Sequence, residues 1–282
     1  MAGAKKSMET HARRRDGGLY LYCLSLKGAI PLSDKNGIDG KNPLFLLSYR
    51  SLRALVSHVS FEDYNEEALK GYMGDLNWLA PRVRRHQEII AYAMDFQPVI
   101  PARFCTIYRG AERVRELMRT HYQNLLSFLN FIRDKEEWGV KVYAEESLLR
   151  KAVESSSQPL RALDEKISSA LPGEGYFLKK KREEVVRQEI ARLLDELSDE
   201  VYQEALSLSV EGKRNRLLSK EATGKEQEML LNGAFLIKKK DAGPFKDKLN
   251  ALMERHRDCG LILEVSGPWP PYNFCPQLEA AQ

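Results

Sequence analysis

Two histidines lie on apolar helix-spaced stripes and are the strongest candidates for acid–base chemistry. His86 falls between Val83 and Ile90, and His121 falls inside the stripe Val114–Ile132. A neutral imidazole there could serve as the general base of a hydrolase. A histidine on an apolar face is more commonly buried and hydrogen-bonded to a carbonyl, and that interpretation is favoured. A hydrolase that uses His86 or His121 stays as an alternative.

The short motifs that hold phosphates, metals or nucleophiles are missing. The sequence contains no G-x-G-x-x-G, G-x-x-x-x-G-K-[ST], H-E-x-x-H, G-x-S-x-G or kinase signature. His256 and Cys259 could share a helical face, but two ligands without two more make a poor zinc site. We therefore expect no catalytic residues, no cofactor and no metal.

Arginine-rich clusters raise the alternative of a nucleic-acid-binding protein. Basic clusters occur at Arg82–Arg85, Arg109–Arg119 and Lys179–Arg182. Glu112 and Glu116 are interleaved with the second stretch at ion-pair spacing, which favours a solvated, ion-paired face. With 44 basic and 40 acidic residues the net charge is only +4, so no nucleic-acid partner is expected.

Compartment and size follow from composition. Four scattered cysteines without a C-x-x-C spacing favour a location in the reducing cytoplasm. Cys23 is expected to be a small buried hydrophobic residue. The basic stretch 1–17 has no apolar core of a secretory signal and is expected to be a disordered lead-in. No apolar run is long enough to span a bilayer. The 282 residues, 43% hydrophobic and 30% charged, suit two globular domains.

The elements that must position these residues begin with an α+β domain over 18–150. Short apolar runs predict three strands, a stripe capped by Asp75 predicts a helix, and Pro98 and Pro101 predict an edge strand or extended segment. A single long helix and a strand are expected to complete this domain. The strand predictions cover Leu19–Leu26, Leu44–Tyr49, Leu52–Ser60, Gln97–Tyr108 and Trp138–Ala144, and the long helix covers Val114–Ile132.

Small polar residues at Ser155–Pro159 predict a boundary to a second domain over 151–282. That domain should open with helices, including a turn at Pro172–Gly175, and continue with strand, helix and strand, which is a ferredoxin-like element. A helix expected over Glu145–Glu154 precedes the boundary. Beyond it the expected elements are helices over Leu160–Leu171 and Tyr176–Leu206, a helix from Pro244, and strands over Leu206–Leu218, Met229–Ile237 and Leu261–Val265, with a loop over Ser219–Gln227.

A proline-rich segment, Gly267–Phe274, displays Trp269, Tyr272 and Phe274 where the last strand ends. Trp269 could close the core or belong to an exposed docking arm, and the closed core is favoured.

Six segments of the chain form a recognisable series. They are, in order, Leu76–Leu79 with His86 downstream, Pro98–Tyr108, Glu137–Val142, Gly175–Lys180, Asn232–Ile237 and Gly267–Phe274. Together they resemble the gas vesicle accessory proteins GvpF and GvpL, and the resemblance extends over roughly Leu19–Phe274. Cys105 departs from the family pattern, where glycine usually follows Arg-Phe. The resemblance does not separate the F branch from the L branch.

The resemblance implies two α+β domains, the second a modified ferredoxin-like fold with additional helices, and no known catalysis. It implies a cytoplasmic accessory protein, associated with gas vesicles, that binds the small hydrophobic shell subunit GvpA and supports nucleation or growth of the shell. Other gas vesicle accessory proteins are further expected partners. Candidate contact residues from the matching segments are Arg85, His86, Arg103, Phe104, Trp269, Tyr272 and Phe274.

Overall fold

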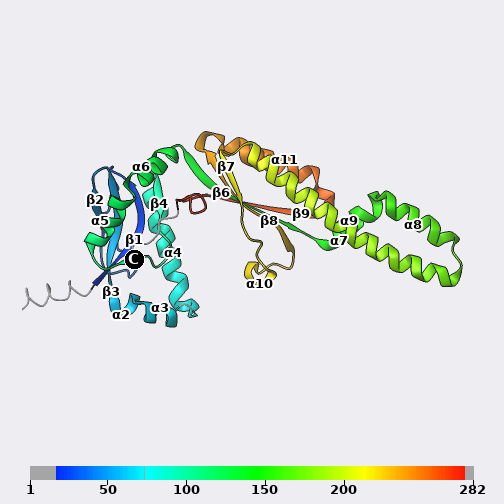
Figure 1. The fold of residues 1–282 in the computed structure, drawn as a ribbon, viewed down its shortest axis with the longest axis horizontal. Coiled ribbons are helices and arrows are strands. Elements are labelled where there is room, and N and C mark those ends of the chain that lie inside the picture. The colour runs from blue at the N-terminus through cyan, green and yellow to red at the C-terminus, as the bar shows by residue number, and fades with distance from the viewer. Residues whose placement is uncertain (1–16, 73, 277–282) are drawn as a thin grey trace, which may run out of the picture. The chain divides into compact units, whose positions relative to one another are not determined.

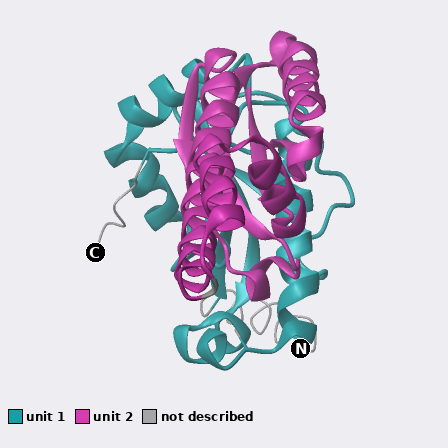
Figure 2. Ribbon diagram, turned by 90° about the vertical axis from the view of Figure 1, so that its right-hand side faces the viewer, with its two compact units in different colours: residues 1–135, 270–282 teal, residues 136–269 magenta. Residues whose placement is uncertain are grey.

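A computed structural model describes residues 17–72 and 74–276, which fall into two compact units (Figure 2). The first unit comprises residues 1–135 and 270–282, and the second comprises residues 136–269. The expected mixture of helices and sheets is confirmed. The basic lead-in expected over 1–17 lies outside the described residues, except for Gly17, which begins the first strand.

The first unit is built on a five-stranded antiparallel sheet in the order β2-β3-β1-β4, with β5 also paired to β1 (Figure 1). Strand β1 has neighbours on both sides and is buried along nearly its whole length, which explains its continuous apolar run. All three N-terminal strand predictions and the edge position of the proline-containing segment are confirmed. The strands are β1 Gly17–Leu26, β2 Leu44–Tyr49, β3 Leu52–Ser60, β4 Val99–Pro101 and β5 Ile107–Tyr108.

Helix α4 packs against this sheet through a buried face. Asp75 caps it as expected, because its side chain accepts a hydrogen bond from the amide of Asn77 at 2.9 Å. Ile90 and Ala93 share a core cluster with Tyr20 and Tyr22 of β1. The helices of this unit are α2 Phe61–Tyr64, α3 Glu66–Tyr72, α4 Leu76–Met94, α5 Ala111–Thr120 and α6 Tyr122–Phe131.

The single helix expected over Val114–Ile132 is wrong, because the structure divides it at His121. His121 ends α5 and precedes α6, with φ −102° and ψ 17°. Its amide still donates to the carbonyl of Leu117, and its carbonyl accepts from Leu125. One non-helical residue thus interrupts the helix while apolar positions continue at helical spacing on both sides, so periodicity alone could not detect the break.

The second unit contains a four-stranded sheet in the order β7-β8-β6-β9. Strand β6 was expected to complete the N-terminal set, but it lies inside this second sheet, where Val140 pairs with Val265. Alternating apolar residues identify a strand without identifying its sheet, which is the physical reason for the error. The strands are β6 Lys135–Ala144, β7 Glu211–Arg214, β8 Glu228–Lys238 and β9 Leu261–Trp269.

Helices α9 and α11 cover one face of that sheet (Figure 1). Val201 of α9 and Phe245 and Leu249 of α11 pack with Phe235 of β8 in one core. The helices are α7 Glu146–Ser156, α8 Gln158–Ser169, α9 Pro172–Ser207, α10 Lys220–Thr223 and α11 Ala242–Arg255, with short 3-10 turns at Lys239–Asp241 and Arg257–Cys259.

Helix α8 and the first half of α9 form what we call the helical hairpin. The separate turn expected at Pro172–Gly175 is wrong, since Pro172 begins α9, where a missing amide proton costs nothing. The expected loop over Ser219–Gln227 contains α10. Ser157, at the expected domain boundary, caps α8 inside one compact unit. Independent folding of 18–150 and 151–282 stays a prediction of the sequence alone, and the sheet order of the second unit favours a different boundary.

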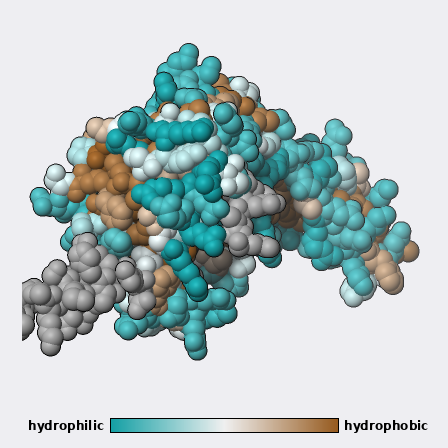
Figure 3. Space-filling view, turned by 60° about the vertical axis from the view of Figure 1, so that its left-hand side comes forward, coloured by the Kyte–Doolittle hydropathy of each residue, from teal (hydrophilic) through white to brown (hydrophobic). Residues whose placement is uncertain are grey.

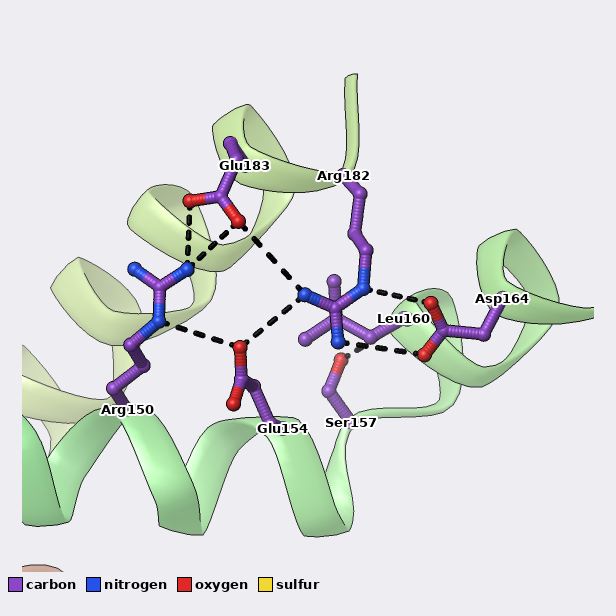
Figure 4. A network of polar contacts seen from close by, with 7 residues as sticks. All are labelled: Arg150, Glu154, Ser157, Leu160, Asp164, Arg182 and Glu183. Atoms are coloured by element: carbon purple, nitrogen blue, oxygen red, sulfur yellow. Dashed lines mark hydrogen bonds and ion pairs between the residues drawn. The ribbon is translucent and has the colours of Figure 1, made fainter. Parts of the chain in front are cut away.

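Ion pairs fasten the helical hairpin to α7 (Figure 4). The Arg150 guanidinium donates to Glu183 at 2.6 Å, and Arg182 donates to Asp164 at 2.7 Å. Glu154 lies 3.2 Å from Arg182 and 3.3 Å from Arg150. Because charged side chains from all three helices take part, a network of ion pairs, and not a single ion pair, joins the hairpin to α7.

Candidate functional site

His86 is the centre of a buried polar cluster in the first unit. Its side chain is 1% exposed, although it lies on a helix with a solvated outer face. Nδ1 lies 3.0 Å from the Tyr20 hydroxyl, and Nε2 lies 3.2 Å from the Ala102 carbonyl oxygen. The Tyr272 hydroxyl is 3.3 Å from Nε2. The favoured interpretation, a buried histidine bonded to a carbonyl, is confirmed.

The partners of the ring fix its protonation. A carbonyl only accepts, so Nε2 carries the proton and donates to Ala102, while Nδ1 accepts from the Tyr20 hydroxyl. Burial lowers the pKa of His86 to about 4, and the bond to Ala102 opposes this only in part. The imidazole is therefore neutral at physiological pH.

The cluster also holds the loop that follows β4. The backbone amide of Cys105 donates to the Tyr20 hydroxyl at 2.9 Å, and Cys105 itself has φ +61°. A positive φ is strained for a residue with a side chain, so the glycine that the resemblance led us to expect here would suit this backbone better than cysteine. The ring of Phe104 meets the His86 ring edge-on, with 5.7 Å between centroids. Tyr20 thus links β1, α4 and this loop.

Partly exposed side chains border the cluster, and we call Arg103, Phe104 and Tyr272 the rim. Arg103 is exposed, whereas Phe104 and Tyr272 are half-buried. Arg85 donates to the Asn36 carbonyl at 2.7 Å and lines an open pocket of about 370 Å³. The rim therefore offers two aromatic rings and a cation on segments that the buried histidine fixes. The other residues that line the Arg85 pocket are Asp34, Asn36, Ile38, Asp39, Gly40, Pro81 and Arg82.

The seven candidate residues are divided between the two compact units. Trp269 belongs to the second unit, and its side chain is 46% exposed, so the expected plug is wrong. Its indole donates to the Ser266 hydroxyl at 3.1 Å. Trp138, 7% exposed, occupies the core of that sheet instead. Phe274 is buried, which is also unlike an exposed arm.

Neither alternative function gains support from these contacts. A base with a pKa near 4 and both ring nitrogens occupied is a weak proton acceptor, which disfavours hydrolysis through His86. His121 is a helix junction. The arginines of α5 pair with glutamates on the same helix, as in Arg113 with Glu116 at 3.2 Å. The ion-paired face expected for this helix is confirmed.

Within residues 17–72 and 74–276, no group of three or more His, Cys, Asp or Glu side chains is placed to hold a metal ion. His256 contacts Glu200 at 2.7 Å. None of the described helices has the length and apolar content to cross a bilayer.

Tyr20 and the Ala102 carbonyl are the site groups that sequence reasoning missed. A usable signal existed, because Tyr20 and Tyr22 are two residues apart in a strand and so share one face. Buried tyrosine hydroxyls need partners. Tyr22 finds them in Ser57 at 2.8 Å and the amide of Ile38 at 2.6 Å.

Comparison with known proteins identifies relatives along nearly the full chain. The family model "Gas vesicle synthesis protein GvpL/GvpF" matches residues 18–276. Gas vesicle protein L of a Streptomyces species is 26% identical over 257 residues, covering 90% of this chain and 91% of the relative. Gas vesicle protein F of the same organism is 28% identical, covering 90% and 98%.

Solved structures share the fold. The crystal structure of the gas vesicle protein GvpF from an Anabaena species has a TM-score of 0.70 at 18% identity, covering 93% of this chain and 99% of that one. The GvpF structure from Microcystis aeruginosa has a TM-score of 0.64 at 17% identity, covering 92% and 99%.

Proposed function

The chain belongs to the GvpL/GvpF family of gas vesicle synthesis proteins, and on that premise we propose that it is a non-enzymatic accessory protein that binds the shell subunit GvpA. Binding would keep the subunit from premature aggregation and support nucleation or growth of the shell. We further propose that it acts in the cytoplasm, at forming vesicles, beside other gas vesicle accessory proteins. The observation that carries the proposal is the family match over residues 18–276.

The rim is our proposed contact surface. Phe104 and Tyr272 present aromatic area that needs little further ordering, because each contacts the buried His86. Aromatic and arginine side chains are the groups that most often anchor protein interfaces. Arg103 and, beside its own pocket, Arg85 add cations. His86 would act as a positioning residue beneath this surface.

A shell subunit needs such a partner for a physical reason. A subunit that polymerises must expose apolar surface and strand edges beforehand, and both promote aggregation in water. A preformed aromatic rim can cover part of that surface. Strand addition at a sheet edge would be a second way to cover the subunit. Strand β9 is an edge strand of the second sheet and could accept such a strand.

We also propose that the second unit is a modified ferredoxin-like domain. Its strands and helices follow the order β6, helices, β7, β8, α11, β9, and the sheet order is β7-β8-β6-β9. The β-α-β-β-α-β succession supports the assignment. Helices α7 and α8 and the first half of α9 are the additions.

Retention of GvpA by the immobilised full chain tests the proposal. We expect the double variant Arg103→Ser, Phe104→Ala to lower affinity at least tenfold, as loss of an aromatic anchor does. Phe96→Ala is the matched control, because Phe96 is a partly exposed phenylalanine of the same unit. Melting temperatures would verify folding. Equal retention by the double variant and the control would remove the rim from the interface, and no retention by the natural chain would reject GvpA binding itself.

A further inference from the structure

The helical hairpin ends in exposed apolar side chains, which we call the tip: Leu171, Tyr176 and Phe177. They are 74%, 68% and 71% exposed. Tyr176 and Phe177 pack edge to face with 5.7 Å between ring centroids. Figure 3 shows apolar surface at the end of this hairpin. Three such residues gathered at one convex end differ from scattered surface hydrophobes and indicate a contact surface.

Uncompensated positive charge adjoins the tip. Lys179, Lys180 and Lys181 follow directly on α9, and helical spacing places Lys180 beside both Tyr176 and Phe177. In the part of the chain that the structure describes, none of the three lysines makes an ion pair. With Glu174 as the one acid in residues 171–181, the segment carries a net charge of +2.

The second unit also contains a pocket whose net charge is opposite to that of the tip, and we call it the acidic pocket. Its volume is about 530 Å³, and Leu149, Ile190, Leu194 and Leu230 supply apolar lining. Pockets of roughly 300 to 1,000 Å³ accept drug-sized groups, so two aromatic side chains can enter. Its charged residues are Glu145, Glu146, Glu226 and Glu228 against Lys220, a net charge of −3.

These glutamates are available for an incoming cation. All four are exposed, and none makes an ion pair among the residues the structure describes. The pocket thus complements the tip in two ways: apolar lining faces apolar side chains, and four carboxylates match three ammonium groups.

The tip cannot reach the pocket of its own chain. Tyr176 and Ile190 lie on the same helix, 14 residues apart, which separates them by about 21 Å at 1.5 Å per residue. The ion pairs of Arg150, Arg182 and Glu183 hold this part of α9 against α7 and α8 (Figure 4). Contact between tip and pocket therefore requires two molecules.

We propose that the tip of one copy docks into the acidic pocket of a second copy, so that the chain self-associates head to tail. Such a contact joins two different surfaces, so each added copy leaves one tip and one pocket open, and association continues unless a ring closes. The contact area is small, and the expected affinity is weak, with a dissociation constant in the micromolar range or above. This inference goes beyond GvpA binding and does not depend on it.

Sedimentation of the full chain at rising concentration tests this. We expect the average mass to increase past that of a dimer. The tip variant Tyr176→Ser, Phe177→Ser and the pocket variant Glu226→Lys, Glu228→Lys should each remain monomeric. Mixed together, they should form a one-to-one complex and stop there, because only one intact tip and one intact pocket remain. The exposed pair Leu76→Ser, Phe96→Ser is the matched control and should associate like the natural chain.

Several results would overturn the proposal. One is that the natural chain stays monomeric up to about 1 mM. Another is that the tip variant still self-associates. A third is that the tip and pocket variants, both folded, form no one-to-one complex when mixed. If the first pocket variant fails to fold, Glu145→Lys, Glu146→Lys replaces it, since both side chains are exposed. Tip-dependent binding to phosphatidylglycerol vesicles without self-association would assign the tip to an anionic lipid surface instead.

Discussion

The Tyr20 hydroxyl lies 3.0 Å from Nδ1 of His86, and both side chains are almost fully buried. Tyr20 sits in the central strand of its sheet, whereas His86 sits on the covering helix. The same hydroxyl oxygen accepts a hydrogen bond from the backbone amide of Cys105 at 2.9 Å. One polar group therefore fixes the distance between helix and sheet and the course of the loop that carries Arg103 and Phe104.

His86 should make the stability of the protein depend on pH. Its pKa is about 4 in the folded chain and about 6.5 when unfolded, so only the unfolded state binds a proton between these values. The stabilisation is fully present above pH 6.5 and is lost as the pH falls towards 4. The loss is at most about 3 kcal/mol. Denaturant unfolding at a series of pH values measures it.

His86→Gln should be less stable at pH 7 and should lack this part of the pH dependence, because glutamine does not titrate. His121→Gln is the matched control, since His121 lies at a helix junction. An unchanged pH profile in His86→Gln would show that the histidine is already accessible to protons in the folded state.

Element types were predictable where local pattern determines them. Strands β1 to β3 have short apolar runs or alternations of the length typical of buried strands, and Asp75 marks a helix start through its own side chain. Which sheet receives β6 depends on pairing with β9, more than a hundred residues later, which no local pattern encodes. The site was predictable only in part for the same reason. His86 could be recognised by its position on an apolar helical stripe, but its hydrogen-bond partners come from Tyr20, Ala102 and Tyr272, which are distant in the sequence.

Trp269→Ala should destabilise the second unit only slightly, by about 1 kcal/mol, because the indole is already 46% exposed. Trp138→Ala is the matched comparison. That side chain is 7% exposed in the core, and its truncation should cost about 3 to 5 kcal/mol. Thermal or denaturant unfolding of both variants gives the two values, and equal losses would restore a plugging role for Trp269.

The domain boundary expected near Ser155–Ser157 differs from the boundaries of the second compact unit, which comprises residues 136–269. Fragments cut at the two alternative boundaries should therefore differ in how they unfold. A fragment over 151–282 lacks β6, which lies between β8 and β9 in the sheet order, so its sheet would be interrupted. A fragment over 136–269 retains every strand except the first residue of β6. We expect the latter to unfold cooperatively and the former not to. Cooperative unfolding of 151–282 alone would favour the boundary expected from the sequence.

Salt should affect GvpA binding only weakly. The proposed rim gains most of its affinity from apolar area on Phe104 and Tyr272, and burial of apolar area does not depend on counterions. A protein that binds phosphates through six or more cations would lose roughly a thousandfold in affinity between 50 and 200 mM salt. We expect a change below about tenfold over that range for GvpA. Retention after nuclease and chelator treatment, at both salt concentrations, is the measurement, with mixed-sequence DNA as the comparison ligand. Steep salt dependence, or retention only when nucleic acid is added, would instead favour binding through the arginine clusters.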